Sequence, residues 1–127
     1  MNTICNADTK KLINDIQLNK LSSKELARCL KHEYMYVVSN AIIMITKLGL
    51  CDDEILNAII PILSCKHEFF NQMSLGNLAL ASLKLMRNNE RAIHIFNDRY
   101  KMLNLNNRVK VDKLVEFLKN EKNLLIK

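Results

Sequence analysis

The sequence predicts an all-α fold, and three observations support this prediction. Apolar residues recur with the helical period of about 3.6 along nearly all of the chain. The 127 residues include only 2 Gly and 1 Pro, whereas a β-sandwich or barrel needs a turn about every ten residues. A hydrophobic content of 49% excludes general disorder. This length suits one hydrophobic core, so we expect residues 1–127 to form a single all-helical domain.

Capping motifs mark the expected helix boundaries in the first half of the chain. An apolar stripe predicts a first helix over about residues 9–18. Ser22 and Glu25 have the spacing of a capping box, in which each side chain accepts a hydrogen bond from the other residue's backbone N–H. They begin a short helix. The next helix is expected over about residues 35–48, and Gly49 ends it because glycine readily adopts the left-handed conformation.

The second half of the chain continues the helical pattern. Asp52 is a suitable N-cap for a helix over residues 54–63, and Pro61 should kink that helix or end its regular hydrogen bonding. A longer helix is expected over about residues 69–87. Two further helices are expected within residues 88–126, and no stretch alternates as a β-strand does.

An internal repeat relates two parts of the chain at an offset of 35 residues. Lys31-His32-Glu33-Tyr34-Met35 recurs as Lys66-His67-Glu68-Phe69-Phe70, and the alignment continues without a gap. Apolar matches alone would also arise by chance between two amphipathic helices, but the shared charged and aromatic motif favours a true repeat. Each copy has a small residue in its longer helix, Ala41 or Gly76, which we expect to let the paired helix approach closely.

The first copy resembles the second helix of a HEAT-like repeat, which has an acidic turn, a Val, a small residue and a closing Leu-Gly. The matching residues are Glu33, Val37, Ala41, Ile45, Leu48 and Gly49. The second copy matches less closely, and the basic residue that often follows the Val is absent. The resemblance covers about residues 23–86. It implies a short α-solenoid of stacked helix pairs, with capping helices at about residues 9–18 and 88–126.

The faces opposite the expected core of the repeat helices form a candidate partner-binding ridge, because the second helices of a solenoid line its concave face. At 100° per residue, this ridge holds Tyr36, Ser39, Ile43, Lys47 and their repeat equivalents Asn71, Ser74, Leu78 and Ser82. Tyr36 is the expected main contact, and Lys47, Arg87 and Arg91 would steer association. Two alternatives stay open: the ridge is exposed to a partner, or the terminal helices cover it.

A zinc site from Cys29, His32, Cys65 and His67 is conceivable but not favoured. Stacked repeats hold matching residues roughly 10 Å apart, whereas Zn–S and Zn–N bonds measure about 2.0–2.3 Å. We interpret the cysteines as reduced, buried thiols and the histidines as solvated. His32 and His67 each precede a glutamate, and such pairs could act in acid–base catalysis. The sequence places no nucleophile or orienting group beside either pair. We therefore predict no catalytic, metal-binding or cofactor-binding residue.

The net charge of +6 lies mainly in the C-terminal third. Residues 87–127 have 10 basic and 5 acidic side chains, a net of +5, against +2 for residues 1–30 and −1 for residues 31–86. Six of these cations are candidate contacts to nucleic-acid phosphates: Arg87, Arg91, Arg99, Arg108, Lys110 and Lys113. Because acidic residues are interspersed, a solvated helix face is the simpler interpretation.

We expect a non-enzymatic protein-binding module. The chain shows no signal-peptide pattern, and its apolar stretches are shorter than the roughly 20 residues that span a bilayer, so a cytoplasmic protein is expected. In size, expected compartment and richness in Asn, Lys and Ile, it resembles small helical immunity proteins of bacterial contact-dependent growth-inhibition systems. The resemblance implies binding and occlusion of a toxin domain. The alternatives are a basic nucleic-acid-binding or scaffold module and, third, an enzyme.

Overall fold

The computed structural model describes the backbone of residues 7–126 and the side chains of residues 7–121. Residues 1–6 and 127 of the expected domain lie outside this part. The described part contains seven α-helices: α1 (Ala7–Gln17), α2 (Ser23–Cys29), α3 (Met35–Leu48), α4 (Asp53–Ile59), α5 (Leu75–Lys84), α6 (Glu90–Lys101) and α7 (Leu105–Ile126). A 3₁₀ helix, η1 (Ile60–Ser64), and a hairpin of β1 (Glu68–Phe70) and β2 (Met73–Ser74) complete it. The predicted all-α class is thus confirmed except for the hairpin.

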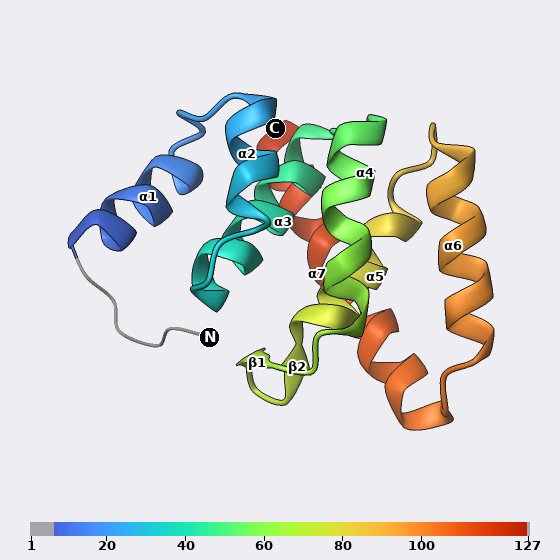
Figure 1. Ribbon diagram of the computed structural model, residues 1–127. Helices are drawn as coiled ribbons and strands as arrows, with labels where there is room; N and C mark the ends of the chain where they lie inside the picture. Colours follow the sequence, from blue (N-terminus) through green and yellow to red (C-terminus); the bar gives the residue numbers. More distant parts are fainter. Residues whose placement is uncertain (1–6, 127) are drawn as a thin grey trace.

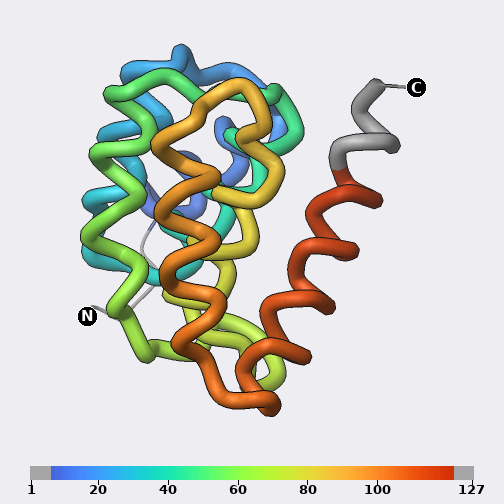
Figure 2. Tube along the Cα trace, turned by 90° about the vertical axis from the view of Figure 1, so that its right-hand side faces the viewer, coloured from blue at the N-terminus to red at the C-terminus, as the bar shows by residue number. Residues whose placement is uncertain are grey.

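The helices lie in layers (Figures 1 and 2). Helices α2, α4 and α6 form one layer, α3 and α5 lie behind them, and α7 crosses the far side of α3 and α5. Helix α1 packs against α3. Each helix of the first layer is followed along the chain by a helix from a deeper layer. Short connections join α2 to α3 and α6 to α7, whereas η1 and the hairpin lie between α4 and α5.

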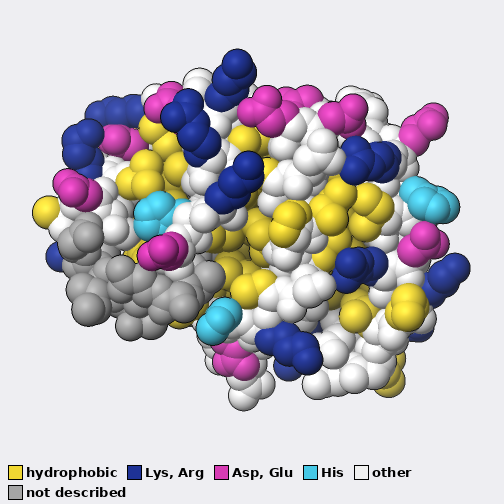
Figure 3. Space-filling view, viewed as in Figure 1, with side chains coloured by type: hydrophobic (Ala, Val, Ile, Leu, Met, Phe, Trp, Pro, Cys, Tyr) yellow, Lys and Arg dark blue, Asp and Glu magenta, His cyan; other side chains and the backbone are white. Residues whose placement is uncertain are grey.

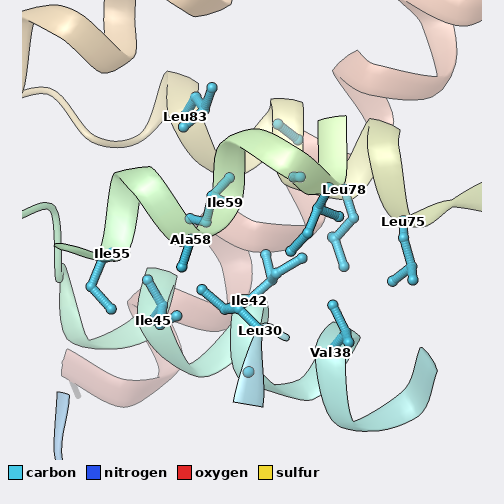
Figure 4. Packing of buried hydrophobic residues seen from close by; sticks show 14 of the residues in the cluster. Leu30, Val38, Ile42, Ile45, Ile55, Ala58, Ile59, Leu75, Leu78 and Leu83 are labelled. Atoms are coloured by element: carbon cyan, nitrogen blue, oxygen red, sulfur yellow. The ribbon is translucent and has the colours of Figure 1, made fainter. Parts of the chain in front are cut away.

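The hydrophobic core fills the space between these layers. Ile42 and Ile45 of α3 face Ile55 and Ile59 of α4, while Leu78 joins them from α5 (Figure 4). All five side chains are fully buried. Complete burial of one such side chain stabilises the fold by about 1.5–3 kcal/mol. A second set of buried residues comes from α7 and covers the other side of α3 and α5: Val111, Leu114, Val115 and Leu118.

Local capping marks the ends of three of these helices, α2, α3 and α4, as the sequence predicts. Ser22 and Glu25 form the reciprocal capping box, and the hydrogen bond from the Ser22 backbone N–H lowers the pKa of Glu25. Gly49 ends α3 with a φ of 69°. The Asp52 carboxylate accepts a hydrogen bond from the third backbone N–H that follows it, at 2.9 Å. Pro61 coincides with the change from α-helix to 3₁₀ helix.

The helix expected over residues 69–87 begins only at Leu75, and this corrects the prediction that the chain has no strand. Phe70 pairs with Met73 across the hairpin, and the turn residues Asn71 and Gln72 have φ values of 42° and 66°. Residues with positive φ cannot continue a right-handed helix. The Ser74 hydroxyl then accepts a hydrogen bond from the Asn77 N–H and caps α5.

Gly76 allows close approach of two backbone segments, as expected, although it lies at the start of α5 rather than in the middle. Its N–H donates to the carbonyl oxygen of Cys65 at 2.9 Å. A Cβ at this position would lie 2.6 Å from that oxygen and 2.7 Å from the carbonyl oxygen of Leu63. Any side chain here would therefore push α5 away from the end of η1.

Candidate partner-binding groove

Most of the expected ridge across α3 and α5 is buried within the protein. Ser39, Leu78 and Ser82 are 3%, 0% and 1% exposed. Ile43 is half-buried and packs against the core. Leu78 points into the core between α3, α4 and α5 (Figure 4), and Ser82 lies beside Ile45 and Thr46 of α3. Burial at these two positions therefore comes from the core rather than from a terminal helix, and no partner can reach the three buried residues in this structure. Their sequence pattern could not distinguish contact with the rest of the chain from contact with a partner.

The remaining ridge residues have separate environments. Lys47 forms an ion pair with Glu121 of α7 at 3.3 Å. Asn71 lies exposed in the hairpin turn, and Ser74 is occupied as the cap of α5. Tyr36, near the start of α3, keeps 43% of its surface exposed. Tyr36 is thus the large apolar member of the predicted set that a partner can reach.

Arg87 and Arg91 lie at the opposite end of α5 from Tyr36 and the hairpin. Arg87 follows the C-terminal end of α5, whereas the hairpin precedes its N-terminal end. Arg91 donates a hydrogen bond to Asn57 of α4 at 2.7 Å and lies 3.9 Å from an oxygen of Asp53. The structure therefore does not bring these two arginines together with Tyr36.

An apolar groove of about 430 Å³ lies where the start of α3 meets the hairpin and the middle of α7. Its lining consists of Tyr36, Phe69, Phe70, Met73, Lys113, Leu114 and Phe117. Phe70 is 69% exposed and Phe117 is 40% exposed. Single exposed apolar residues are common on proteins, but a cluster of exposed apolar groups marks an interaction site more often. This groove is the candidate functional site.

Three elements position the aromatic rings of the groove. The Tyr36 ring packs edge-on against the buried Tyr34 ring, with 5.3 Å between their centroids. Phe70 belongs to β1 and faces Met73 in the register of the hairpin. Phe117 extends from α7 beside the buried Leu118. The groove therefore depends on three elements that are far apart in the sequence.

Sequence reasoning found Tyr36 but missed Phe69, Phe70, Met73 and Phe117. The two phenylalanines were expected at the start of a helix over residues 69–87. Phe117 lies outside the apolar stripe of the last helix, and a large apolar residue outside such a stripe was the available clue. The other clue was the pair of adjacent aromatic residues before Asn71, since aromatic residues favour strands and asparagine favours turns.

Contacts between α6 and α7 fix the α7 wall of the groove. Arg108 donates hydrogen bonds to the carbonyl oxygens of Tyr100 at 3.3 Å and Lys101 at 2.7 Å. Its guanidinium also lies over the Tyr100 ring, 5.5 Å from the centroid. The Tyr100 hydroxyl donates to the Asp112 carboxylate at 2.9 Å. This hydrogen bond raises the pKa of Tyr100, because the carboxylate stabilises the protonated phenol.

Tyr100 is expected to stabilise the protein in a pH-dependent way. Its pKa is raised above the reference value of 10.0, so its contribution is fully present below that value and is lost as the pH rises through the folded-state pKa. The stability difference between wild type and Tyr100→Phe should therefore be smaller at about pH 11 than at about pH 8, with the decrease beginning above about pH 10. Urea unfolding of both proteins at each pH measures this difference.

Tyr36→Phe is the matched control for this pH experiment, because the Tyr36 hydroxyl has no hydrogen-bond partner among the described residues. We expect removal of that hydroxyl to leave stability nearly unchanged at both pH values. Equal and pH-independent effects of Tyr100→Phe and Tyr36→Phe would contradict a role for the Tyr100–Asp112 hydrogen bond.

A second depression, polar and about 440 Å³ in volume, lies on the other side of the hairpin. Lys66 precedes the hairpin and Lys110 comes from α7, and both line it. Amide and hydroxyl side chains complete its polar wall, namely Ser64, Gln72, Ser74, Asn77 and Asn107. Glu68 is the one carboxylate in this lining. The hairpin thus separates an apolar groove from a basic, polar pocket, and α7 contributes to both.

The conceivable zinc ligands do not converge. Within the described part of the chain, no group of three or more His, Cys, Asp and Glu side chains is placed to hold a metal ion. His32 instead accepts a hydrogen bond at Nδ1 from the backbone N–H of Tyr34, at 2.9 Å. Cys29 is buried, and burial raises the pKa of its thiol. Such a thiol is a poor nucleophile, since the thiolate is the reactive form.

The basic side chains do not form one continuous stripe on the face that carries α2, α4 and α6. Lys and Arg are intermixed there with Asp and Glu (Figure 3). Of the six cations considered for phosphate binding, Arg91 and Arg108 have partners within the protein. Lys110 and Lys113 belong to the pocket and the groove.

No helix in the described residues is both long enough and apolar enough to span a membrane. In comparisons with known proteins, no family model, no curated protein and no solved structure matches this chain.

Proposed function

We propose that the chain is a protein-binding module whose apolar groove takes up a side chain of a partner protein. The observation that carries this proposal is the cluster of Tyr36, Phe70 and Phe117, three partly exposed aromatic rings around one depression. Aromatic residues are enriched at the centres of protein interfaces, where a few of them supply most of the binding energy. Binding requires no change of fold, because the rings already line the open groove.

The proposed partner is a toxin domain, with this chain as its immunity protein. Support for this step comes from the small helical chain and its composition, together with a groove suited to a protein surface. The mechanism is occlusion: the bound chain covers the toxin's active site or its entrance. In the same proposal, the pairs α2–α3 and α4–α5 act as HEAT-like units and α7 caps them. Packing of α7 on α3 and α5 then holds the groove in shape.

A nucleic-acid-binding function has less support. Binding along a phosphate backbone needs several free cations that follow one path. Arg91 and Arg108 already have partners within the protein, and Arg87 lies at the far end of α5 from Lys110. A titration of nonspecific duplex DNA at low salt separates the two functions. Binding that weakens steeply with added salt would favour the nucleic-acid function over the proposed one.

Growth protection tests the proposed function. The chain is expressed together with the toxin domain encoded beside its gene, and we expect wild type to restore growth. Phe70→Ala and Phe117→Ala should each weaken toxin binding by about tenfold or more, with reduced protection. Leu105→Ala is the matched control, since Leu105 lies on α7 at 79% exposure and outside the groove.

Two results would contradict the proposal. One is a wild-type chain that neither binds nor neutralises the neighbouring toxin, or the lack of any toxin gene beside its own. The other is full protection by both phenylalanine variants, because the groove would then have no part in binding. Unfolding curves of the purified variants verify that each is folded, which the exposure of Phe70 and Phe117 leads us to expect.

A further inference from the structure

The apolar groove and the polar pocket lie on either side of one hairpin and share α7. Lys113 and Phe117 line the groove, and Lys110 lines the pocket. Since an α-helix rises about 1.5 Å per residue, Lys110 and Phe117 are about 10 Å apart along α7. A single segment of a partner can therefore reach both depressions.

The two depressions together carry an excess of positive charge. Their linings contain three lysines, Lys66, Lys110 and Lys113, against one carboxylate, Glu68. None of the three lysines forms an ion pair with a described carboxylate. By contrast, Lys47 and Lys119 are neutralised by Glu121 and Glu116. The charge around the hairpin is thus left for a bound group of opposite sign.

We propose that the hairpin site recognises an acidic segment of the partner protein, with one apolar side chain in the groove and a carboxylate about 10 Å away beside Lys110 and Lys66. This inference rests on the proposed function and adds the chemistry of the partner. The apolar side chain supplies contact area, and the carboxylate sets orientation and rejects basic segments.

The arrangement of rings favours a protein segment over single-stranded nucleic acid. Stacking of successive bases needs ring faces in series along a basic channel. Here the rings of Tyr36, Phe70 and Phe117 surround one groove with a single lysine, Lys113. Lys66 and Lys110 lie across the hairpin in a different depression. One groove of this kind accommodates one anchoring side chain.

A phage-displayed library of random peptides is the probe for this inference. Peptides are selected on the wild-type protein and depleted on the Phe70→Ala variant, which removes binders outside the groove. We expect the enriched peptides to share an aromatic or aliphatic residue and an Asp or Glu at a fixed separation. Enrichment of neutral or basic peptides, or no enrichment over the variant, would overturn the inference.

Anisotropy measurements on a labelled synthetic copy of the best peptide then test the charge directly. Lys66→Gln combined with Lys110→Gln should weaken binding by about tenfold at low salt, and less at high salt. Lys10→Gln combined with Lys24→Gln is the control, because it removes the same charge from exposed positions on α1 and α2. Equal affinity of both double variants would overturn the charge recognition.

The outcomes separate this inference from the proposed function. If the toxin is neutralised and Phe70→Ala impairs neutralisation, but the Lys66/Lys110 variant protects fully, the groove functions without charge recognition. If acidic peptides bind but the neighbouring toxin is not neutralised, the proposed toxin partner is wrong and the recognition chemistry stands. Displacement of the peptide by a single-stranded oligonucleotide at equal concentration would instead identify a nucleic-acid site.

Discussion

Replacement of Leu118 by alanine is expected to lower the free energy of unfolding by about 2–5 kcal/mol. Leu118 lies on α7, is fully buried, and belongs to the core formed with α3 and α5. The substitution removes buried methyl groups and leaves a cavity that the surrounding helices fill only in part. Urea unfolding followed by circular dichroism measures the loss.

Leu105→Ala is the control for this prediction, because it is the same substitution on the same helix at a residue that is 79% exposed. Surface changes of this kind usually alter stability by at most about 0.5 kcal/mol. A large difference between the two variants is expected. Similar small effects would mean that α7 does not cover α3 and α5 in solution.

Local features of the fold followed from the sequence because their causes are local. The capping box at Ser22, the N-cap at Asp52 and the left-handed Gly49 each depend on residues within four positions. Pro61 acts on its own turn of helix. Such features need no knowledge of the rest of the chain, and all of them were predicted correctly.

The two copies of the 35-residue repeat are similar in sequence but differ in structure where each helix begins. The motif that begins at Lys31 leads directly into α3 at Met35, whereas its copy at Lys66 leads into the hairpin. Helix α5 therefore begins at Leu75, which is 40 residues after Met35 rather than 35. Two turn residues with positive φ cause this delay. The hydrophobic pattern that extends the alignment does not reveal that these two residues adopt positive φ.

The site was harder to predict than the fold because it depends on the position of α7. Leu78 and Ser82 had the pattern of an outward face, and both are buried within the protein. The packing of α7 on α3 and α5 places Phe117 in one groove with Tyr36 and Phe70. Neither outcome follows from the amphipathic pattern of α3 and α5, because that pattern does not say which element of the chain covers their second face.

Replacement of Gly76 by alanine is expected to destabilise the protein by about 1–3 kcal/mol. Alanine is the better helix former by up to about 1 kcal/mol, so the loss must come from the contact with the end of η1. The new Cβ would lie 2.6 Å from the carbonyl oxygen of Cys65 and 2.7 Å from that of Leu63. These are backbone atoms, and they cannot turn away as a flexible side chain does.

The same substitution should also disturb the groove, because α5 begins directly after the hairpin that carries Phe70 and Met73. Asn77→Ala is the control: it introduces the same residue at the next position of α5, where the backbone N–H keeps its bond to Ser74. We expect that variant to unfold near the wild-type midpoint. If Gly76→Ala proved equally mild, the segment from Leu63 to Cys65 would have to move freely. The hairpin could then not act as a rigid wall between the groove and the pocket.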